Sequence, residues 1–317
     1  MKLSRFLRRI SSRADGGTQT KDGNENDELK NTVPVTEDYK TRPPILLQLD
    51  KCQYKLTPFK QGGICDVYKG TPETDDQPTI AVKMIRKEWY TNSRVRRQFS
   101  TESQIVRDLQ EKHLPHYISR GLINGKPYYA YEFIEGFRLI NLSQKQDIFP
   151  PELIKDISLD ITKQLLHSLH YMHTTLNPIA HGDISSENII FDDWHNIHLI
   201  DFGCAHFLKM VDRNAYQWVG KPSFISPEQA RGEAWDQRSD IYQAGILFYE
   251  LTMGARWNVG TDSRSKTLYA ASAEPPSRDF LASEVGLDIS AVIAKMLHPR
   301  PQSRYQSAKA VLKDMGN

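Results

Sequence analysis

The stretch that most constrains the fold of this chain is His181–Ile190, HGDISSENII, together with the segment FDDWHNIHLID that follows it. This second segment has a polar DWHN tip between two apolar arms, which is typical of a β-hairpin. If Asp192 lies opposite Ile197, the same register places Asn188 opposite Asp201. Directly opposed residues have Cα atoms roughly 4.5–5.5 Å apart, so an amide and a carboxylate would lie side by side.

Asn188 and Asp201 therefore form a candidate Mg²⁺ site. Mg²⁺ takes hard oxygen ligands, and it is usually held by one or two protein groups plus water and substrate phosphates. A further carboxylate, Asp183, lies on the same loop, shortly before Asn188. The simpler interpretation is that each polar residue only caps a turn.

The segments HGDISSEN and IDFG resemble the catalytic loop and the metal-binding turn of protein kinases. The resemblance covers residues 45–317 and implies a two-lobed α+β fold, with a small β-rich N-lobe at 45–135 and a larger helical C-lobe at 136–317. It implies that Asp183 orients and deprotonates the hydroxyl that receives the γ-phosphoryl group of ATP. In the same way it assigns Mg²⁺ to Asn188 and Asp201.

Length and composition allow such a fold and exclude other classes. With 317 residues and 39% apolar residues, the chain can bury the core of one large domain or two lobes. A net charge of +2 gives no strong attraction to nucleic acid. The three cysteines are widely spaced and form no CxxC pair, which predicts reduced thiols in the cytoplasm. No apolar run approaches about 18 residues, so no membrane-spanning helix is expected.

Two segments precede the predicted kinase domain. Residues 1–14 carry five basic residues, no acidic one and an apolar stripe at helical spacing from Leu3 to Ile10. Such a helix can lie on an anionic bilayer surface, which predicts peripheral membrane contact. A disordered basic tail and an organelle transit peptide are the alternatives. Residues 15–44 are polar and nearly lack large apolar side chains, so we predict a disordered linker.

The segment FKQGGICDVYKG resembles the glycine-rich loop of protein kinases. Gly62 and Gly63 would form the turn, and Val67 would lie on the strand beyond it. Glycines let backbone N–H groups approach a phosphate closely. Lys60 and Cys65 stand where the family usually has its first and third glycines, so this loop departs from the pattern.

The segment TIAVK predicts a strand on which Ala81 and Lys83 share one face. A helix is predicted over Ser93–Glu111, and Glu102 lies at the centre of its apolar stripe. A buried carboxylate costs several kcal/mol unless it is paired, so we expect Glu102 to pair with Lys83. In protein kinases this pair positions the lysine on the α- and β-phosphates. Alternatively, Glu102 is a surface residue on a helix that packs differently.

The segment PYYAYEFIEG alternates as a strand that ends near Gly136. By resemblance, Tyr131 takes the gatekeeper position and Glu132–Ile134 form the hinge whose backbone binds the purine. The resemblance thus assigns nucleotide contacts to Gly62, Gly63, Val67, Ala81, Lys83, Glu132 and Ile134.

The catalytic loop departs from the family pattern at two positions. Gly182 replaces the arginine that many protein kinases have before the catalytic aspartate, so activity should not require a phosphate on the activation loop. Ser185 replaces the lysine that usually helps to hold the γ-phosphate. In VGKPSFISPE, Lys221 takes the place of a threonine. We predict that Lys221 acts in catalysis by supplying the charge that Ser185 lacks.

The C-lobe sequence adds elements that hold this loop. Glu228 is expected to pair with Arg304, and Asp240 to hold the backbone of the catalytic loop, as in protein kinases. Helices are predicted at about 151–173, from Asp240 onward, around Ile289–Leu297 and over Ser307–Met315. The first of these has a predicted apolar face, formed by Ile154, Ile157, Ile161, Leu165, Leu169 and Met172.

The pattern favours a serine/threonine kinase that acts on proteins, since SSEN lacks the sequence typical of tyrosine kinases. HGDIS and PQSRYQSA also resemble bacterial kinases of eukaryotic type. HGD followed by Asn188 is found in aminoglycoside and choline kinases too, so a small-molecule phosphotransferase is an alternative; the SPE segment with Asp240 and Arg304 favours a protein substrate. The altered glycine loop and Ser185 leave a third alternative, a nucleotide-binding pseudokinase scaffold.

Overall fold

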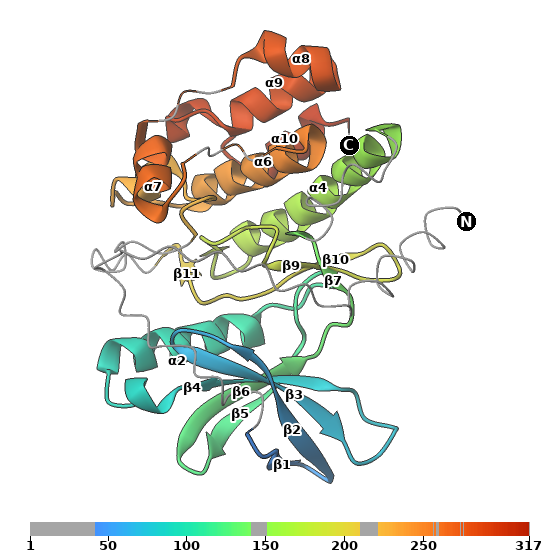
Figure 1. Ribbon diagram of the computed structural model, residues 1–317, viewed down its shortest axis with the longest axis vertical. Coiled ribbons are helices and arrows are strands. Elements are labelled where there is room, and N and C mark those ends of the chain that lie inside the picture. The colour runs from blue at the N-terminus through green and yellow to red at the C-terminus, as the bar shows by residue number, and fades with distance from the viewer. Residues whose placement is uncertain are drawn as a thin grey trace. The chain divides into compact units, whose positions relative to one another are not determined.

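The structure is a computed structural model that describes residues 42–140, 151–209, 221–255, 257, 260–272, 274 and 276–316. The chain divides into two compact units. Of the described residues, the first unit contains those up to Asp108 and Pro115–Glu135, and the second contains Leu109–Leu114 and those from Gly136 onward. The predicted basic segment 1–14 and most of the predicted linker 15–44 lie outside the described residues. Figure 1 colours the chain by residue number and labels its elements.

The first unit is built on a six-stranded antiparallel sheet of order β1-β2-β3-β4-β6-β5. Its strands are β1 (Ile45–Leu49), β2 (Cys52–Gln61), β3 (Cys65–Pro72), β4 (Ile80–Ile85), β5 (Tyr117–Ile123) and β6 (Lys126–Glu132). Alternate residues of these strands form one buried cluster, because side chains of a strand point to opposite faces in turn. The cluster includes Tyr54, Leu56, Ile80, Val82, Met84 and Ala130.

A short 3₁₀ helix (Lys87–Trp89) and the helix α2 (Ser93–Asp108) complete this unit. The Asn92 side chain begins α2, because its Oδ1 accepts hydrogen bonds from the N–H groups of Arg94 and Val95. The helix α2 ends at Asp108, three residues before its predicted end at Glu111. The next residues, Leu109–Leu114, belong to the second unit. There the N–H of Gln110 donates to the Tyr171 hydroxyl at 2.9 Å, which accounts for the early end.

The second unit is mainly helical. Its helices are α4 (Pro151–Thr174), α5 (Pro227–Ala230), α6 (Gln237–Met253), α7 (Ser263–Ser272), α8 (Arg278–Val285), α9 (Leu287–Met296), a 3₁₀ helix (Pro301–Ser303) and α10 (Ala308–Asp314). The unit also contains two small antiparallel sheets. One has the order β10-β9-β7, with β7 (Phe137–Arg138), β9 (Ile189–Phe191) and β10 (Ile197–Leu199). The other pairs β8 (Ile179–Ala180) with β11 (His206–Phe207).

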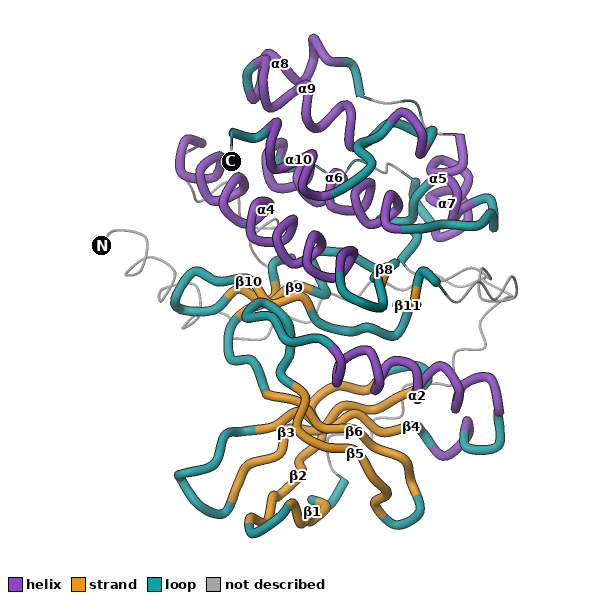
Figure 2. Tube along the Cα trace, turned by 180° about the vertical axis from the view of Figure 1, so that it is seen from behind, coloured by secondary structure: helices purple, strands orange, loops and turns teal. Residues whose placement is uncertain are grey.

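The helices α4 and α6 lie side by side and form the core of the second unit (Figure 2). On α4 the predicted apolar face is buried at Ile157, Ile161, Leu165, Leu169 and Met172. The helix α6 begins at Gln237, before the predicted Asp240. Asp236 caps it by accepting a hydrogen bond from the N–H of Arg238. Among the described residues, no helix is both long enough and apolar enough to cross a membrane.

The predicted register of the hairpin was wrong by one residue. Phe191 pairs with Ile197, whereas the prediction had placed Asp192 there. The turn decides the difference, because Asp192 and Asn196 close a three-residue loop through Asp192 N–H to Asn196 O at 3.0 Å. His195 takes a φ of +66°, which completes the tighter turn.

The corrected register changes the partner of Asn188. Its carbonyl oxygen accepts a hydrogen bond from the N–H of Ile200 at 2.8 Å, so Asn188 does not lie opposite Asp201. Asp201 follows with a φ of +67°, in the left-handed region that few residues other than glycine adopt.

Candidate active site

All of the predicted site residues lie in the part of the chain that the structure describes. In the first unit, Lys83 on β4 and Glu102 on α2 form the expected ion pair, with Lys83 Nζ 2.6 Å from Glu102 Oε1. Glu102 is only 3% exposed. A buried carboxylate needs such a partner to offset its lost hydration.

A third member of this group was not predicted. The hydroxyl of Tyr129 on β6 donates to the same Glu102 oxygen at 2.8 Å. Burial raises the pKa of Tyr129 well above its ordinary value, and the nearby Glu102 charge raises it further, so the hydroxyl keeps its proton. Because Tyr129 pairs with Lys83 across β4 and β6, strand register was the signal that could have identified it.

The predicted glycine turn joins β2 and β3. A Cβ atom on Gly62 would lie 2.5 Å from the carbonyl oxygen of Cys65, so only glycine fits there, whereas Gly63 meets nothing within 4 Å. Two side chains hold the turn by its carbonyl oxygens: Arg86 Nη1 donates to Gly62 O at 2.9 Å and Trp89 Nε1 to Gly63 O at 3.0 Å.

The other predicted nucleotide contacts lie on the same sheet. Val67 on β3 pairs with Lys83, and the buried Ala81 shares the strand face of Lys83. At the end of β6, the N–H of Glu132 donates to His116 O at 2.8 Å, and Ile134 follows as part of the last segment of this unit.

In the second unit, the carboxylate of Asp183 is the centre of a hydrogen-bonded cluster. Asn188 Nδ2 donates to Asp183 Oδ2 at 2.7 Å and to Asp183 O at 2.9 Å. The backbone N–H of Lys221 donates to Asp183 Oδ1 at 3.1 Å. These contacts hold the carboxylate in one orientation.

The ammonium group of Lys221 lies in the same cluster. Its Nζ donates to Ser185 Oγ at 2.8 Å and lies 3.5 Å from Asp183 Oδ2 and 3.8 Å from Glu187 Oε2. The structure thus brings together Lys221 and Ser185, which the prediction had linked.

Burial raises the pKa of Asp183, while the charges of Lys221 and His181 lower it and that of Asp201 raises it. The net effect is a pKa above the ordinary aspartate value. A carboxylate of this kind is a better proton acceptor than an exposed aspartate.

Asp240 on α6 holds the backbone of this loop. It accepts hydrogen bonds from the N–H groups of His181 at 2.9 Å and Gly182 at 2.8 Å, and from His173 Nε2 at 2.8 Å. Burial alone would raise the pKa of Asp240, but these partners outweigh burial and lower it. Asp240 therefore stays ionised.

The remaining acceptor of Asn188 suits a metal ion. Both hydrogens of its amide are directed at Asp183, which leaves the carbonyl oxygen as the group's further binding atom. Among the described residues, there is no group of three or more His, Cys, Asp and Glu side chains that could hold a metal. A site with Asn188 and Asp201 as its protein ligands fits Mg²⁺, which takes the rest of its shell from water and phosphates.

Further along the unit, the expected pair of Glu228 and Arg304 is present and buried, with contacts of 2.6 and 2.7 Å. Burial alone would raise the pKa of Glu228, but the hydrogen bond and charge of Arg304 lower it below its ordinary value.

Comparison with known proteins identifies similar chains. The sequence profile described as "Protein kinase domain" matches residues 59–315. The serine/threonine-protein kinase PrkC of Bacillus subtilis is 28% identical over 80% of this chain and 38% of its own length. PknB of Mycobacterium leprae is 27% identical over 74% of this chain and 38% of its own length. PknL of Mycobacterium tuberculosis is 26% identical over 87% of this chain and 68% of its own length. The chain thus spans less than half the length of PrkC and PknB.

Proposed function

The chain belongs to the protein kinase family, and from this premise we propose that it transfers the γ-phosphoryl group of ATP to serine or threonine hydroxyls of proteins. The observation that carries the proposal is the position of Asp183, whose carboxylate is held by Asn188 and Lys221 and whose pKa is raised. The names of the relatives support serine and threonine as acceptors.

Asp183 acts on the acceptor hydroxyl. As the hydroxyl oxygen attacks the γ-phosphorus, its proton passes to the Asp183 carboxylate, and the bond from the γ-phosphorus to the β,γ-bridging oxygen breaks, so that ADP leaves. Lys83, fixed by Glu102, positions the α- and β-phosphates. Asn188 and Asp201 would hold Mg²⁺, which supplies neutralising charge to the phosphates. Most of the rate enhancement then comes from positioning and charge.

Lys221 replaces a cation that the catalytic loop lacks. Ser185 has no charge, but the Lys221 ammonium lies 2.8 Å from its hydroxyl. A positive charge at this point can stabilise the transferring phosphoryl group. We assign this role to Lys221 from the activation segment.

Activity does not depend on phosphorylation of the activation segment. Gly182 carries no cation that could bind such a phosphate. The space beside Gly182 is filled by the indole of Trp235. Asp240, Gln229 and Gln243 hold the loop through hydrogen bonds to its backbone, and Trp235 supports it through packing.

We further propose that the chain acts in the cytoplasm and contacts membrane surfaces through residues 1–14. None of the three cysteines forms a disulfide, which is the usual state in a reducing compartment. The basic amphipathic sequence of 1–14 supports the membrane contact.

The test is incubation of the purified chain with Mg-ATP and a generic protein substrate. We expect phosphoserine or phosphothreonine, and a loss of roughly 100-fold to 10,000-fold in Asp183→Asn. Asp193→Asn, an exposed aspartate in the hairpin turn, is the matched control and should keep full activity. Labelling of small aminated alcohols instead of protein would favour the small-molecule alternative. Bound nucleotide with no transfer to any acceptor would favour a pseudokinase.

A further inference from the structure

The turn between β2 and β3 is held by three consecutive carbonyl oxygens. Arg86 Nη1 donates to Gly62 O at 2.9 Å, and Trp89 Nε1 donates to Gly63 O at 3.0 Å. The backbone N–H of Arg86 donates to Ile64 O at 2.9 Å. All of these donors belong to the short segment that joins β4 to α2. This one segment therefore fixes the orientation of three successive peptide units.

Fixed carbonyl groups determine where the N–H groups of the turn point. The peptide units of the turn are trans, and in a trans unit the N–H points in the direction opposite to the C=O. The N–H groups of Gly63 and Ile64 are therefore directed away from Arg86 and Trp89. Neither of them donates a hydrogen bond to another residue within the described part of the chain. Successive backbone N–H groups in a turn form a concave binding site for anions.

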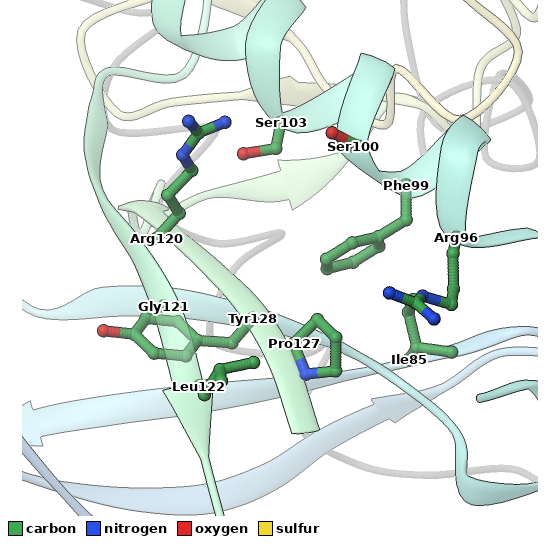
Figure 3. A pocket seen from close by; sticks show the side chains of 10 residues that line it. All are labelled: Ile85, Arg96, Phe99, Ser100, Ser103, Arg120, Gly121, Leu122, Pro127 and Tyr128. Carbon is green, nitrogen blue, oxygen red and sulfur yellow. The ribbon is translucent and has the colours of Figure 1, made fainter. Parts of the chain in front are cut away.

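Arg86 and Lys83 lie on opposite faces of the sheet. Lys83 pairs with Glu102 on α2, and Figure 3 shows the side chain of Ile85 beside the same helix. Met84 lies on the other face, in the buried cluster of the sheet. Arg86 follows with an extended backbone, so its side chain continues the Met84 face, and both residues line a cavity of about 360 Å³ there. The side of the turn that points away from the Arg86 side chain is thus the side of Lys83.

Neither the backbone conformation nor the packing of the described residues requires glycine at position 63. The φ of Gly63 lies outside the left-handed region, and an ideal Cβ atom there would meet no described atom within 4 Å. Gly62 differs, because a Cβ atom there would lie 2.5 Å from the carbonyl oxygen of Cys65. The open space beside Gly63 leaves its backbone accessible to a bound group, and close approach of a ligand to the backbone is a common use of glycine.

We propose that Arg86 and Trp89 are positioning residues of the nucleotide site. They hold the N–H groups of Gly63 and Ile64 toward the phosphates of ATP, on the side of the sheet where Lys83 lies. Both side chains act through the turn and do not touch the nucleotide. The proposal rests on ATP as the nucleotide of the proposed function, but it concerns phosphate binding and does not require phosphoryl transfer.

Arg86 is anchored for this role. Its side chain is 7% exposed, and its Nη2 donates to Glu88 Oε1 at 2.6 Å, so the guanidinium is held between a carboxylate and the Gly62 carbonyl. Hydrogen bonds from a charged donor are roughly twice as strong as those between neutral groups. The contact of Arg86 with Gly62 should therefore contribute more to the shape of the turn than the neutral contact of Trp89 with Gly63.

Nucleotide titrations of the full chain separate positioning from a general effect on the fold. Trp89→Phe removes the indole N–H and keeps an aromatic ring, and Arg86→Met removes the guanidinium. With Mg²⁺ and the non-hydrolysable ATP analogue AMP-PNP, we expect calorimetry to show a Kd raised about 3-fold to 10-fold in Trp89→Phe and about 10-fold or more in Arg86→Met. The Kd of adenosine, which has no phosphate, should change by less than about 2-fold in both variants. Trp194→Phe and Arg97→Met, at exposed positions, are the matched controls.

The comparison of the two ligands decides between the outcomes. Equal weakening of AMP-PNP and adenosine would show that Arg86 and Trp89 only support the fold, and AMP-PNP affinities at the control values would also overturn the proposal. Arg86→Lys keeps a charged donor and should bind AMP-PNP more tightly than Arg86→Met. If the unsubstituted chain binds AMP-PNP but transfers no phosphate from ATP, the proposed function fails, whereas phosphate-specific losses in the variants still support the positioning role. A chain that does not bind AMP-PNP would contradict both.

A double-mutant cycle tests whether Trp89 acts through the peptide unit that joins Gly63 to Ile64. Ile64→Pro removes the N–H of this unit, whereas Ile64→Ala keeps it. Trp89→Phe should weaken AMP-PNP binding fully in the Ile64→Ala background but by less than about 2-fold in the Ile64→Pro background, because the N–H that Trp89 orients is already absent. Equal losses in the two backgrounds would show that Trp89 does not act through this N–H.

Discussion

An ideal Cβ atom on Gly182 would lie 2.2 Å from Cη2 of Trp235. The indole ring is 6% exposed, so it cannot easily move away. Gly182 also has a φ of +75°, a conformation that suits glycine. Glycine at position 182, where many protein kinases have an arginine, is therefore required both by the left-handed backbone conformation and by the Trp235 ring beside it.

This relationship predicts a large difference between two glycine substitutions. Gly232→Ala, at a similar φ of +68° but in open space, should cost about 1 kcal/mol of unfolding free energy. Gly182→Ala should cost about 2–4 kcal/mol, because the clash with Trp235 adds to the backbone strain. Denaturant unfolding measures both. In a Trp235→Val background, the difference between the unfolding free-energy costs of Gly182→Ala and Gly232→Ala should shrink. An unchanged difference would show that Trp235 is not its cause.

A lysine at position 185 of the catalytic loop should be able to take over the role of Lys221. Lys221→Thr should lower kcat roughly 100-fold, because the charge on the transferring phosphoryl group loses its partner. Ser185→Lys added to Lys221→Thr should recover much of the loss, since the two side chains lie 2.8 Å apart. Lys209→Thr, an exposed lysine, is the control in the same steady-state assay. Full activity in Lys221→Thr would contradict the role assigned to this residue.

The hydroxyl of Tyr129 should stabilise the buried Glu102. Tyr129→Phe removes the hydrogen bond and leaves the ring in place, which should cost about 1–2 kcal/mol of unfolding free energy. A double-mutant cycle with Glu102→Gln should give a coupling energy of about 1 kcal/mol. If the two changes are additive, the hydrogen bond contributes nothing to stability.

The pH dependence of kcat/KM should report the state of Asp183. Burial raises the pKa of this carboxyl above its ordinary value of 3.8, so activity should fall with decreasing pH at a higher pH than an exposed aspartate would give. Only the ionised form accepts a proton, which is why the loss lies on the acid side. Lys221 lowers this pKa, so Lys221→Met should move the acid limb to still higher pH. Lys209→Met should leave it in place, and a shift to lower pH in Lys221→Met would exclude Asp183 as the titrating group.

Some contacts could be predicted from local patterns. Glu102 lies at the centre of an apolar helical stripe, and burial there requires a cation, so the pair with Lys83 could be expected from the amino-acid sequence. The apolar face of α4 followed in the same way from helical periodicity. The resemblance to protein kinases supplied the pairing of Glu228 with Arg304 and the role of Asp240 in holding the loop.

Other features depended on details that sequence patterns do not resolve. The hairpin register was missed by one residue, because the turn closes through hydrogen bonds of the Asp192 side chain that a hydrophobic pattern does not encode. Leu109–Leu114 was expected in the N-lobe but packs with the second unit. Tyr129 was overlooked because its importance follows from the strand that pairs with β4.

From the sequence alone, burial of Glu102 in an apolar helical stripe predicted its pair with Lys83, because burial of a charge follows from a local pattern, and the resemblance to protein kinases implied the fold and the candidate base Asp183. Only the tertiary structure decided that Lys221 lies on Ser185, that Tyr129 shares Glu102 with Lys83 and that Trp235 fills the space beside Gly182. These contacts join residues that are distant in sequence, and their distances depend on how strands and helices pack rather than on the period of any one segment.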